Sequence, residues 1–504
     1  MLPLHSLTLS DVLRENARSY PRVTAVVDGQ VRHTYAEMDR RVDALARAFG
    51  QHGVGEGDRV AWLGQNSFRV LESLLACARV GAVLVPVNWR QSADEVAFIL
   101  DDLTPRVVIW ESESAPDSVV HAHEKASDRT HWVSAADAYE TLIADSDSGP
   151  VDTAVAVEAP VLGLYTAAFD GRPNCALLSQ SGIIAHDMSL AMIRQIEPGF
   201  VYLNSGPLFH VGTMMFCLAT FHLAGTNVFM PSFDPREACR LVDEEECQSM
   251  LLFPPMDEQM VAANRDGAFD LTSLRAAAGS DEWNAMVTVD PSPWGRALGG
   301  YGQTEVGGML TLLGLGIGGQ GTHGRPSPLM QVRLVDEHGE EVPTGEVGEI
   351  VARGWHAMVG YHNRPELNEC KQQNGWHHTG DLGLREPDGT LTFVGPKLHM
   401  IKSAGENIYP AEVERALRRH AAVDDCAVIG VPDSTWHQSV LAIVVAKPGG
   451  SVQAEDLIIH CKTEIASYKK PRDVIFVDAI PKRGLRPDYD VLDELHGGGG
   501  YPGG

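Results

Sequence analysis

The chain has 504 residues, 44% hydrophobic and 21% charged, and its 67 acidic residues against 40 basic ones give a formal net charge of −27. This composition is typical of a folded globular protein, and the length exceeds what one hydrophobic core usually supports, so at least two domains are predicted. So large an excess of acid repels phosphate backbones and anionic membranes, which excludes nucleic acid as a main partner.

The first part of the chain alternates strand-like and helix-like segments. Residues 59–63, 82–87 and 106–110 are short apolar runs typical of buried strands, and 68–78 and 95–100 have helical periodicity. Strands that alternate with helices form βαβ units, in which a parallel sheet is covered by helices on both faces. We therefore predict such a sheet for the larger part of the chain.

Residues 198–233 form the longest stretch without Asp, Glu, Lys or Arg. A membrane span and a buried core segment both fit an uncharged stretch. Asn204, Pro207, His210 and His222 would be costly in hydrocarbon, so we favour a buried core segment and expect no transmembrane segment.

From residue 331 onward, short strands separated by turns indicate a small β-subdomain, followed by a compact α+β domain. The predicted strands are 331–335, 348–352, 391–394, 427–431 and 441–445, the predicted helices are 410–419 and 454–464, and 395–405 is a predicted loop. We divide the chain into an N-terminal domain at 1–394, a hinge linker at 395–400, a C-terminal domain at 401–492 and a flexible glycine-rich tail at 493–504.

Eight cysteines are spread along the chain, and no two form a C-x-x-C pair. This spacing indicates reduced thiols rather than a disulfide framework or a zinc site. The first residues contain neither a basic segment nor a long apolar run, so no signal peptide is expected. We therefore expect a cytoplasmic protein.

Five short motifs follow one another in a characteristic order. They are PLFHVG at 207–212, YGQTE at 301–305, GEVGEI at 345–350, HTGD at 378–381 and IKSAGENIYP at 401–410. Together they resemble the adenylate-forming superfamily and, within it, the acyl-CoA synthetases. The resemblance extends from residue 34 to residue 482, nearly the whole chain.

The resemblance implies an α/β fold with a large N-terminal domain of stacked α/β sheets, a small β-subdomain and a small mobile C-terminal α+β domain. It also implies a reaction in two steps. A carboxylate attacks the α-phosphate of ATP, giving an acyl-adenylate and pyrophosphate, and the thiol of coenzyme A then displaces AMP. The expected co-substrates are ATP, Mg²⁺ and CoA, together with a fatty or other apolar carboxylic acid.

The resemblance assigns catalytic roles to Thr304, Glu305 and His210. Glu305 would supply the hard oxygen ligand that Mg²⁺ needs, and Thr304 a hydroxyl for a phosphate oxygen. Asp381 would accept hydrogen bonds from both ribose hydroxyls, and Tyr301 would stack on adenine. His210 would lie beside the acyl and adenylate groups. The structural alternatives are a capping acid for Glu305, a turn residue for Asp381 and a core histidine for His210.

The remaining predicted site residues follow the family motifs. Those expected to bind the nucleotide are Gly302, Gln303, Thr166, Arg172, Lys397, Lys402 and Gly405. Those expected to bind the acid are Phe209, His210, Ala278, Gly279, Ser280 and Gly300. The small residues at 278–280 leave room for a bulky or long acid.

The phosphate-binding loop departs from the family pattern Y-T-S-G-T-T-G-x-P-K-G. Residues 165–175 read YTAAFDGRPNC, so most hydroxyls are absent and Asn174 replaces the lysine that holds phosphate. Asp170 adds a negative charge, and like charges about 4 Å apart repel by about 1 kcal/mol even in water. Arg172 would compensate in part.

Two further departures lie toward the C-terminus. In the hinge, where the family has G-R-x-K-D, residues 395–399 read GPKLH, so that Lys397 replaces an arginine without its planar fork. Pro487 stands where the family has its catalytic lysine, one residue after Arg486. A preorganised charge of this kind contributes about 10²–10³ in rate.

Two hypotheses follow from the motifs and their departures. The first, which we favour, is an AMP-forming acyl-CoA synthetase with altered phosphate contacts, in which Arg172, Lys397 or Arg486 replaces the missing cations. The second is a non-catalytic homologue that binds an acyl or nucleotide ligand or a partner protein. The oligomeric state stays open, although homodimers are common in such families.

Overall fold

The computed structural model describes residues 4, 6–112, 115–124, 130–144, 146, 149–151, 153–166, 173–253, 255–296, 299–397, 399–403, 406–447, 452–483 and 486–499, with the backbone only for residues 294, 296, 483 and 486. Within these ranges no helix is both long and apolar enough to cross a membrane. The uncharged stretch 198–233 forms β9 (Val201–Asn204), α8 (Val211–His222) and β10 (Thr226–Phe229), and most of its side chains are buried. The prediction of a core segment is therefore confirmed.

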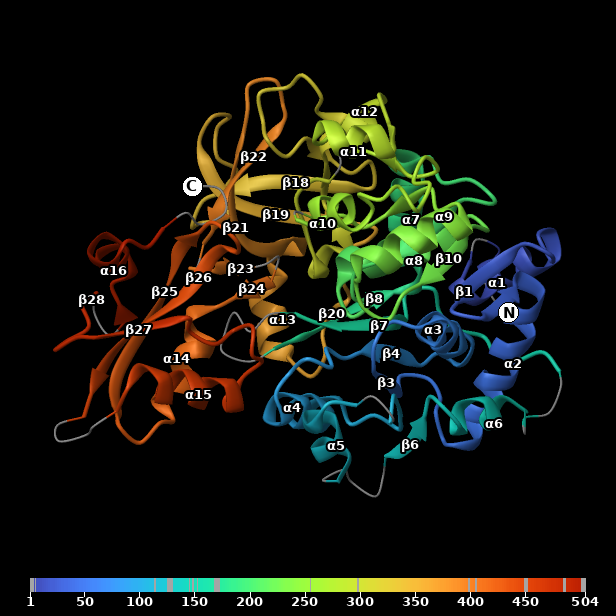
Figure 1. The fold of residues 1–504 in the computed structure, drawn as a ribbon, viewed down its shortest axis with the longest axis horizontal. Coiled ribbons are helices and arrows are strands. Elements are labelled where there is room, and N and C mark those ends of the chain that lie inside the picture. The colour runs from blue at the N-terminus through green and yellow to red at the C-terminus, as the bar shows by residue number, and fades with distance from the viewer. Residues whose placement is uncertain are drawn as a thin grey trace.

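A seven-stranded, mostly parallel sheet forms the centre of the large domain (Figure 1). Its order is β20 (Gly360–Tyr361), β8 (Cys175–Ser179), β7 (Pro160–Tyr165), β4 (Val83–Pro86), β3 (Arg59–Leu63), β5 (Val107–Trp110) and β6 (His131–Ser134). Successive side chains of β3 point to opposite faces. Leu63 packs in the cluster of α4 (Ala93–Leu103), and Trp62 in that of α3 (Phe68–Val80). Helices thus cover both faces of this sheet, as the alternation of strands and helices in the sequence predicts.

A second sheet of five strands packs beside the first. Its order is β11 (Ser249–Met250), β9, β10, β1 (Thr24–Asp28) and β2 (Val31–Thr34), and only the β1–β2 pair is antiparallel. One apolar cluster joins the two sheets through α3 and α8, with Val26 and Phe229 on one side and Trp62 and Leu164 on the other. The large domain thus has a continuous core between two stacked sheets.

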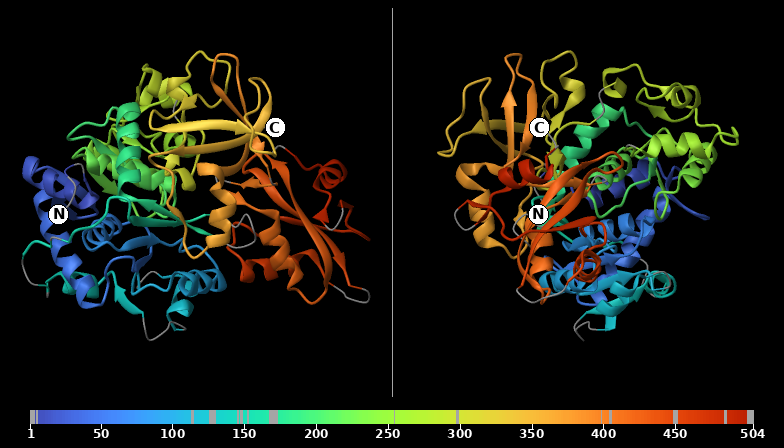
Figure 2. Two further views of the ribbon diagram at one scale, coloured as in Figure 1. Left: turned by 180° about the vertical axis from the view of Figure 1, so that it is seen from behind. Right: turned by 60° about the vertical axis from the view of Figure 1, so that its left-hand side comes forward.

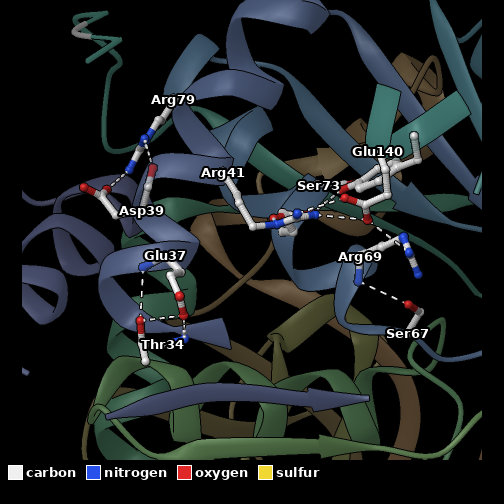
Figure 3. A network of polar contacts seen from close by, with 11 residues as sticks. Thr34, Glu37, Asp39, Arg41, Ser67, Arg69, Ser73, Arg79 and Glu140 are labelled. Atoms are coloured by element: carbon white, nitrogen blue, oxygen red, sulfur yellow. Dashed lines mark hydrogen bonds and ion pairs between the residues drawn. The ribbon is translucent and has the colours of Figure 1, made fainter. Parts of the chain in front are cut away.

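Ion pairs among buried side chains join the N-terminal helices (Figure 3). Arg79 on α3 is fully buried and pairs with Asp39 on α2 (Tyr35–Gln51). Arg41 on α2 pairs with the fully buried Glu72 at 2.6 Å and with Glu140 on α6 (Ala138–Ala144) at 2.9 Å. Removal of one partner would leave a buried charge uncompensated, at a cost of about 3–5 kcal/mol. This network holds the helices against the core.

The small β-subdomain is a four-stranded antiparallel sheet. Its order is β18 (Met330–Val335), β19 (Val347–Gly354), β21 (His377–Arg385) and β22 (Leu391–Pro396). Along β18 buried and exposed residues alternate at first, so that one face of the strand lies on the core and the other on the surface. The strands predicted at 331–335, 348–352 and 391–394 are confirmed.

The C-terminal domain is an α+β unit at one end of the molecule, orange to red in Figure 2. Its sheet has the order β24 (Glu406–Ile408), β23 (Ile401–Ser403), β26 (His437–Ala446) and β25 (Val423–Asp433), and β27 (Asp473–Phe476) also pairs with β26. Its helices are α14 (Pro410–Arg418), α15 (Ala454–Glu464) and α16 (Tyr489–His496). The fold class predicted from the sequence is confirmed.

Two boundary predictions were wrong. Residues 395–405 are not one loop, because β22 continues to Pro396 and 401–403 form β23, which pairs with β24 and β26. Residues 493–496 belong to α16 rather than to a flexible tail, because Asp488 caps this helix and Leu492 anchors it in the core. After Gly497 ends the helix, the Gly499 carbonyl accepts a hydrogen bond from Gln438 Nε2 at 2.8 Å.

The remaining elements are short or lie at the periphery. They are α1 (Leu9–Ser19), α5 (Asp117–Glu124), α7 (Gln180–Arg194), α9 (Pro235–Glu245), α10 (Met256–Ala263), β12 (Arg275–Ala276), α11 (Asp281–Met286), β13 (Thr288–Val289), α12 (Pro293–Arg296), β14 (Gly302–Gln303), η1 (Thr304–Val306), β15 (Gly308–Met309), β16 (Thr311–Leu312), η2 (Leu313–Leu315), β17 (Arg325–Pro326), α13 (Pro365–Lys371), η3 (Gln373–Gly375), β28 (Lys482–Arg483) and β29 (Arg486–Pro487).

Candidate active site

A cavity of about 490 Å³ lies where the large domain meets the C-terminal domain. Its walls come from segments far apart in the sequence, because the ends of several strands and the start of α8 converge there. The predicted site residues that line it are Thr166, Phe209, His210, Gly300, Tyr301, Gly302, Gln303, Thr304, Glu305, Asp381 and Lys402. The tertiary structure thus brings most of the predicted nucleotide-binding residues into one cavity.

Some predicted residues lie elsewhere. Ser280 caps α11 and accepts a hydrogen bond from the Trp283 N–H at 3.1 Å, so Ala278, Gly279 and Ser280 are exposed and do not line the cavity. Lys397 pairs with Glu349 at 2.9 Å and does not line it either. Arg172 and Gly405, like Asp170 and the side chain of Arg486, lie outside the described residues.

Asp381 lies at the centre of a hydrogen-bonded group. The phenol of Tyr301 donates to Asp381 Oδ2 at 2.6 Å, and the amide of Gln303 donates to the same oxygen at 3.3 Å. His377 Nε2 in turn donates to Gln303 Oε1 at 3.0 Å, which fixes the amide. Burial raises the pKa of Asp381 to about 6, although the Tyr301 hydrogen bond opposes the shift. These contacts hold a carboxylate ready to accept further hydrogen bonds.

Tyr301 occupies the position expected for stacking on adenine. Its ring stacks on Phe393, with ring centroids 5.4 Å apart and planes at 21°. The Tyr301 ring therefore stacks on another protein side chain in this structure. Stacking of Tyr301 on adenine stays a prediction.

Thr304 and Glu305 lie on η1, a single turn held at both ends. His356 Nδ1 donates to the Val306 carbonyl at 2.7 Å, and the Met309 N–H donates to His186 Nε2 at 3.0 Å. Gly307 follows with φ of +71°, and a Cβ there would lie 2.8 Å from the His356 carbonyl oxygen. The turn therefore needs glycine, and its two buried histidines fix where Glu305 points.

Glu305 is buried, with 7% of its surface exposed, yet it lines the cavity. The Tyr361 hydroxyl donates to Glu305 Oε1 at 2.8 Å. Burial raises the pKa of this carboxyl, and the charge of Lys371 opposes the shift. Among the described residues, no group of three or more His, Cys, Asp or Glu could hold a metal alone. A single carboxylate fits Mg²⁺ that arrives with ATP, because such ions take most ligands from phosphates and water.

His210 is the N-cap residue of α8 and lines the cavity. Its side chain is exposed, and Nδ1 accepts a hydrogen bond from the Gly212 N–H at 3.2 Å. A neutral imidazole that accepts at Nδ1 carries its proton on Nε2, which makes that nitrogen a donor. Because the side chain is exposed and acts as a helix cap, the core-histidine alternative is wrong.

The residue at the position of the family's phosphate-binding lysine faces away from the cavity. Asn174 is fully buried, and its Oδ1 accepts from Arg364 Nε at 3.0 Å. Arg364 also donates to Asp102 at 2.8 Å, and Asp102 accepts from the Tyr165 hydroxyl at 2.9 Å. Asn174 thus takes part in a hydrogen-bonded group with Arg364, which in turn binds Asp102, and it does not line the cavity.

The segment that carries Pro487 also lies away from the cavity. Strands β28 and β29 form a hairpin, and Lys482 at its start pairs with Asp425 on β25 at 2.8 Å. None of the described residues of this hairpin lines the cavity. In this arrangement of the domains, neither Pro487 nor the backbone of Arg486 reaches the site.

Charged residues to which the sequence analysis gave no role join the two domains. Buried Lys469 pairs with Glu95 of the large domain at 2.6 Å and with Glu412 of the C-terminal domain at 2.8 Å. Arg90 of the large domain pairs with Glu406 at 2.6 Å. Sequence analysis missed these contacts because each partner, taken alone, is an ordinary charged residue.

Sequence analysis also missed Lys371 and Tyr361, which line the cavity beside Glu305. Tyr361 follows Gly360, and this glycine–tyrosine pair, which comes after the GEVGEI motif, is the signal in the sequence that points to it. Lys371 is the last residue of α13 and has no such signal.

Two family models match the chain: "AMP-binding enzyme" over residues 13–362 and "AMP-binding enzyme C-terminal domain" over residues 412–485. A feruloyl-CoA synthase of an Amycolatopsis species is 36% identical over 473 residues, which are 93% of this chain and 94% of the relative. An indoleacetate–CoA ligase of Aromatoleum aromaticum is 32% identical, over 95% of this chain and 96% of the relative.

The fold also matches that of solved structures. A Bacillus subtilis o-succinylbenzoate CoA synthetase superposes with a TM-score of 0.82 at 23% identity, covering 96% of this chain and 98% of the other.

Proposed function

The chain belongs to the AMP-binding enzymes and, within them, to the acyl-CoA synthetases, and on this premise we propose that it activates an aromatic or other apolar carboxylic acid and transfers it to coenzyme A. The co-substrates of such a ligase are ATP, Mg²⁺ and CoA. The observation that carries the proposal is the single cavity lined by Glu305, Asp381 and His210, at the junction of the two domains.

The two steps give each side chain a role. In the first, a carboxylate oxygen of the acid forms a bond to the α-phosphorus, and pyrophosphate leaves. Asp381 would accept hydrogen bonds from the ribose hydroxyls, Thr304 would donate to a phosphate oxygen, and Glu305 would hold Mg²⁺, which supplies positive charge beside the phosphates. In the second step the thiol loses its proton to water, its sulfur bonds to the acyl carbon, and the carbon–oxygen bond to the phosphate breaks, so that AMP leaves with the electron pair.

His210 supports the acid in this scheme. Its Nε2–H is a donor, and both His210 and the preceding residue, Phe209, line the cavity. A hydrogen bond from Nε2 to an oxygen of the acid would orient that group toward the α-phosphorus. Phe209 would contact the apolar part of the acid.

The acid class is proposed from the relatives. Feruloyl-CoA synthase and indoleacetate–CoA ligase are named for acids that carry an aromatic ring. An aromatic acid is flat and apolar, and it suits this cavity because Phe209 lines it. The centroid of the Phe209 ring lies 5.2 Å from the Arg90 guanidinium. Fatty acids are the next class to examine.

The two steps need different groups beside the same adenylate, so we infer that the C-terminal domain moves about the hinge at 395–400 between them. Such a motion would break the pairs of Arg90 with Glu406 and of Lys469 with Glu95. It would also be needed to bring the hairpin of β28 and β29 toward the cavity.

Pyrophosphate release tests the proposal directly. We expect release that depends on acid, ATP and Mg²⁺ when the protein is given cinnamate-type, indole-type, fatty and short acids, with the aromatic acids fastest. The thioester should appear when CoA is added. Absence of release with every acid, together with no thermal shift on ATP and Mg²⁺, would contradict enzyme function and favour the non-catalytic homologue.

A further inference from the structure

The cavity must neutralise phosphate charge without two of the family's lysines. Asn174 is buried and bound to Arg364, and the hairpin with Pro487 lies elsewhere. Among the described residues that line the cavity, the lysine and arginine side chains are Lys371, Lys402 and Lys469. Their surroundings differ, and the difference identifies which one suits a phosphate.

Two of the three lysines are engaged by the C-terminal domain. Lys469 lies between the carboxylates of Glu95 and Glu412, at 2.6 and 2.8 Å, and these pairs neutralise its charge. Lys402 is on β23 and donates to Asn407 Oδ1 at 2.8 Å. Both would shift with the C-terminal domain whenever it moves.

Lys371 belongs to the large domain, which carries the nucleotide-binding motifs. It ends α13, and its Nζ donates to the carbonyl oxygen of His378 at 3.3 Å. A Cβ built on Gly380 would lie 3.1 Å from Nζ, so the glycine of the HTGD motif lets the ammonium group lie close to the backbone. This contact places Nζ one residue from Asp381.

Lys371 lines the cavity together with both carboxylates of the site, Asp381 and Glu305. Its Nζ is held beside the backbone of the HTGD motif that carries Asp381. A phosphate attached to a ribose bound by Asp381 would therefore begin in the same part of the cavity as this ammonium group.

We propose that Lys371 is a phosphate-binding residue of this site, and that its ammonium group holds a non-bridging oxygen of the phosphate attached to the ribose. This inference rests on the proposed function and assigns to Lys371 the part of the charge neutralisation that Asn174 and Pro487 do not supply. An ammonium group has three donors, so it can hold the His378 carbonyl and a phosphate oxygen together. No proton transfer is required of it.

Binding of AMP and of adenosine by calorimetry tests this role, because the two ligands differ only by the phosphate. Lys371→Met should weaken AMP binding about 10- to 100-fold, the range expected for one charge-assisted hydrogen bond, and leave adenosine binding within about twofold. Lys371→Arg should retain most of the AMP affinity because it keeps the charge. Lys462→Met, an exposed lysine on α15, is the matched control and should bind both ligands normally.

Three results would overturn the inference. One is unchanged AMP affinity in Lys371→Met. Another is an equal loss for AMP and adenosine, which would indicate a structural role. The third is that wild-type protein binds adenosine but gains nothing from the phosphate. If wild-type protein binds neither ligand, the proposed function fails and the inference fails with it. Should the methionine variant fold poorly, Lys371→Gln carries the same expectation.

Discussion

The side of the cavity proposed to bind ribose and Mg²⁺, which we call the ribose and metal side, differs from the side expected to bind phosphate, the phosphate side. On the first, Tyr301, Gln303 and Asp381 form a hydrogen-bonded group, and Glu305 is fixed by Tyr361. On the second, Asn174 is bound to Arg364 beneath the loop, and the hairpin that would bring a C-terminal cation pairs with Asp425. One side keeps its polar groups aimed at a ligand, and the other uses the corresponding residues to hold protein segments together.

This difference indicates that an asparagine at the position expected for a phosphate-binding lysine is compatible with the fold. The Asn174 side chain makes a neutral hydrogen bond to Arg364, whereas a lysine there would place a second cation beside the guanidinium in a buried region. The substitution is therefore consistent with local stability. In the proposed function, Lys371 and the Mg²⁺ that arrives with ATP would neutralise the phosphate charge.

The largest expected effect comes from removal of the ribose-binding carboxylate. Asp381→Ala should lower kcat/KM for ATP by at least about 100-fold, because two hydrogen bonds to a charged acceptor are lost. Steady-state pyrophosphate release measures this loss. Glu340→Ala, an exposed acid on the β-subdomain, is the control and should keep full activity. Equal rates in Asp381→Ala and wild type would remove the ribose assignment and the distinction between the two sides of the cavity.

The next effect is a pH dependence on the same side. Burial raises the pKa of Asp381 to about 6, Tyr301 and Lys371 lower it, and Glu305 raises it. The ionised form accepts from both ribose hydroxyls, and protonation below pH 6 removes this capacity. Activity should therefore fall about tenfold between pH 7 and pH 5, as a group of this pKa passes from mostly ionised to mostly protonated.

The pH profile of kcat/KM for ATP measures this group in the free enzyme. Lys371→Met should move the acid limb to higher pH, because it removes a cation that favours the ionised carboxylate. A rate that stays constant from pH 5 to pH 7 would show that the carboxylate is not needed in its ionised form.

The smallest effect is expected on the phosphate side. Pro487→Lys restores the family residue on a hairpin that does not line the cavity, so it should raise pyrophosphate release by only about three- to tenfold. A preorganised cation in the site would raise the rate about 10²- to 10³-fold. Single-turnover adenylation measures the gain, with Lys482→Met as a control for charge elsewhere on the hairpin. No gain would mean that the hairpin does not enter the site during adenylation.

Local patterns predicted the regular elements well. The helix at 454–464 is α15, and the strand at 59–63 is β3, because periodicity and burial agree along their whole length. The sequence predicted a loop at 395–405, but residues 401–403 form β23. This strand has only three residues, too few to show the alternation of a strand in the sequence. Its order comes from pairing with β24 and with β26, which no local pattern shows.

The residues of the candidate site also fall into those that the sequence predicted and those that depend on tertiary contacts. Motif residues such as Glu305 and Asp381 were predicted because the order of the motifs is specific, and the structure brings them into one cavity. Residues 278–280 were expected to line the acid pocket, but Ser280 caps α11 and holds them at the surface. Lys371 carries no signal in the sequence, since a lysine at the end of a helix is ordinarily a favourable partner of the helix dipole.

The sequence by itself determined the family, the α/β class and the motif residues that we propose to bind ribose and Mg²⁺. These follow from periodicity and from motif order, which are properties of neighbouring residues. Only the tertiary structure decided that Asn174 supports Arg364, that Lys469 joins two carboxylates across the domains, and that Lys371 lies beside Asp381. Charges act through space, so the cations of this cavity depend on which distant segments the fold brings within a few ångströms of one another.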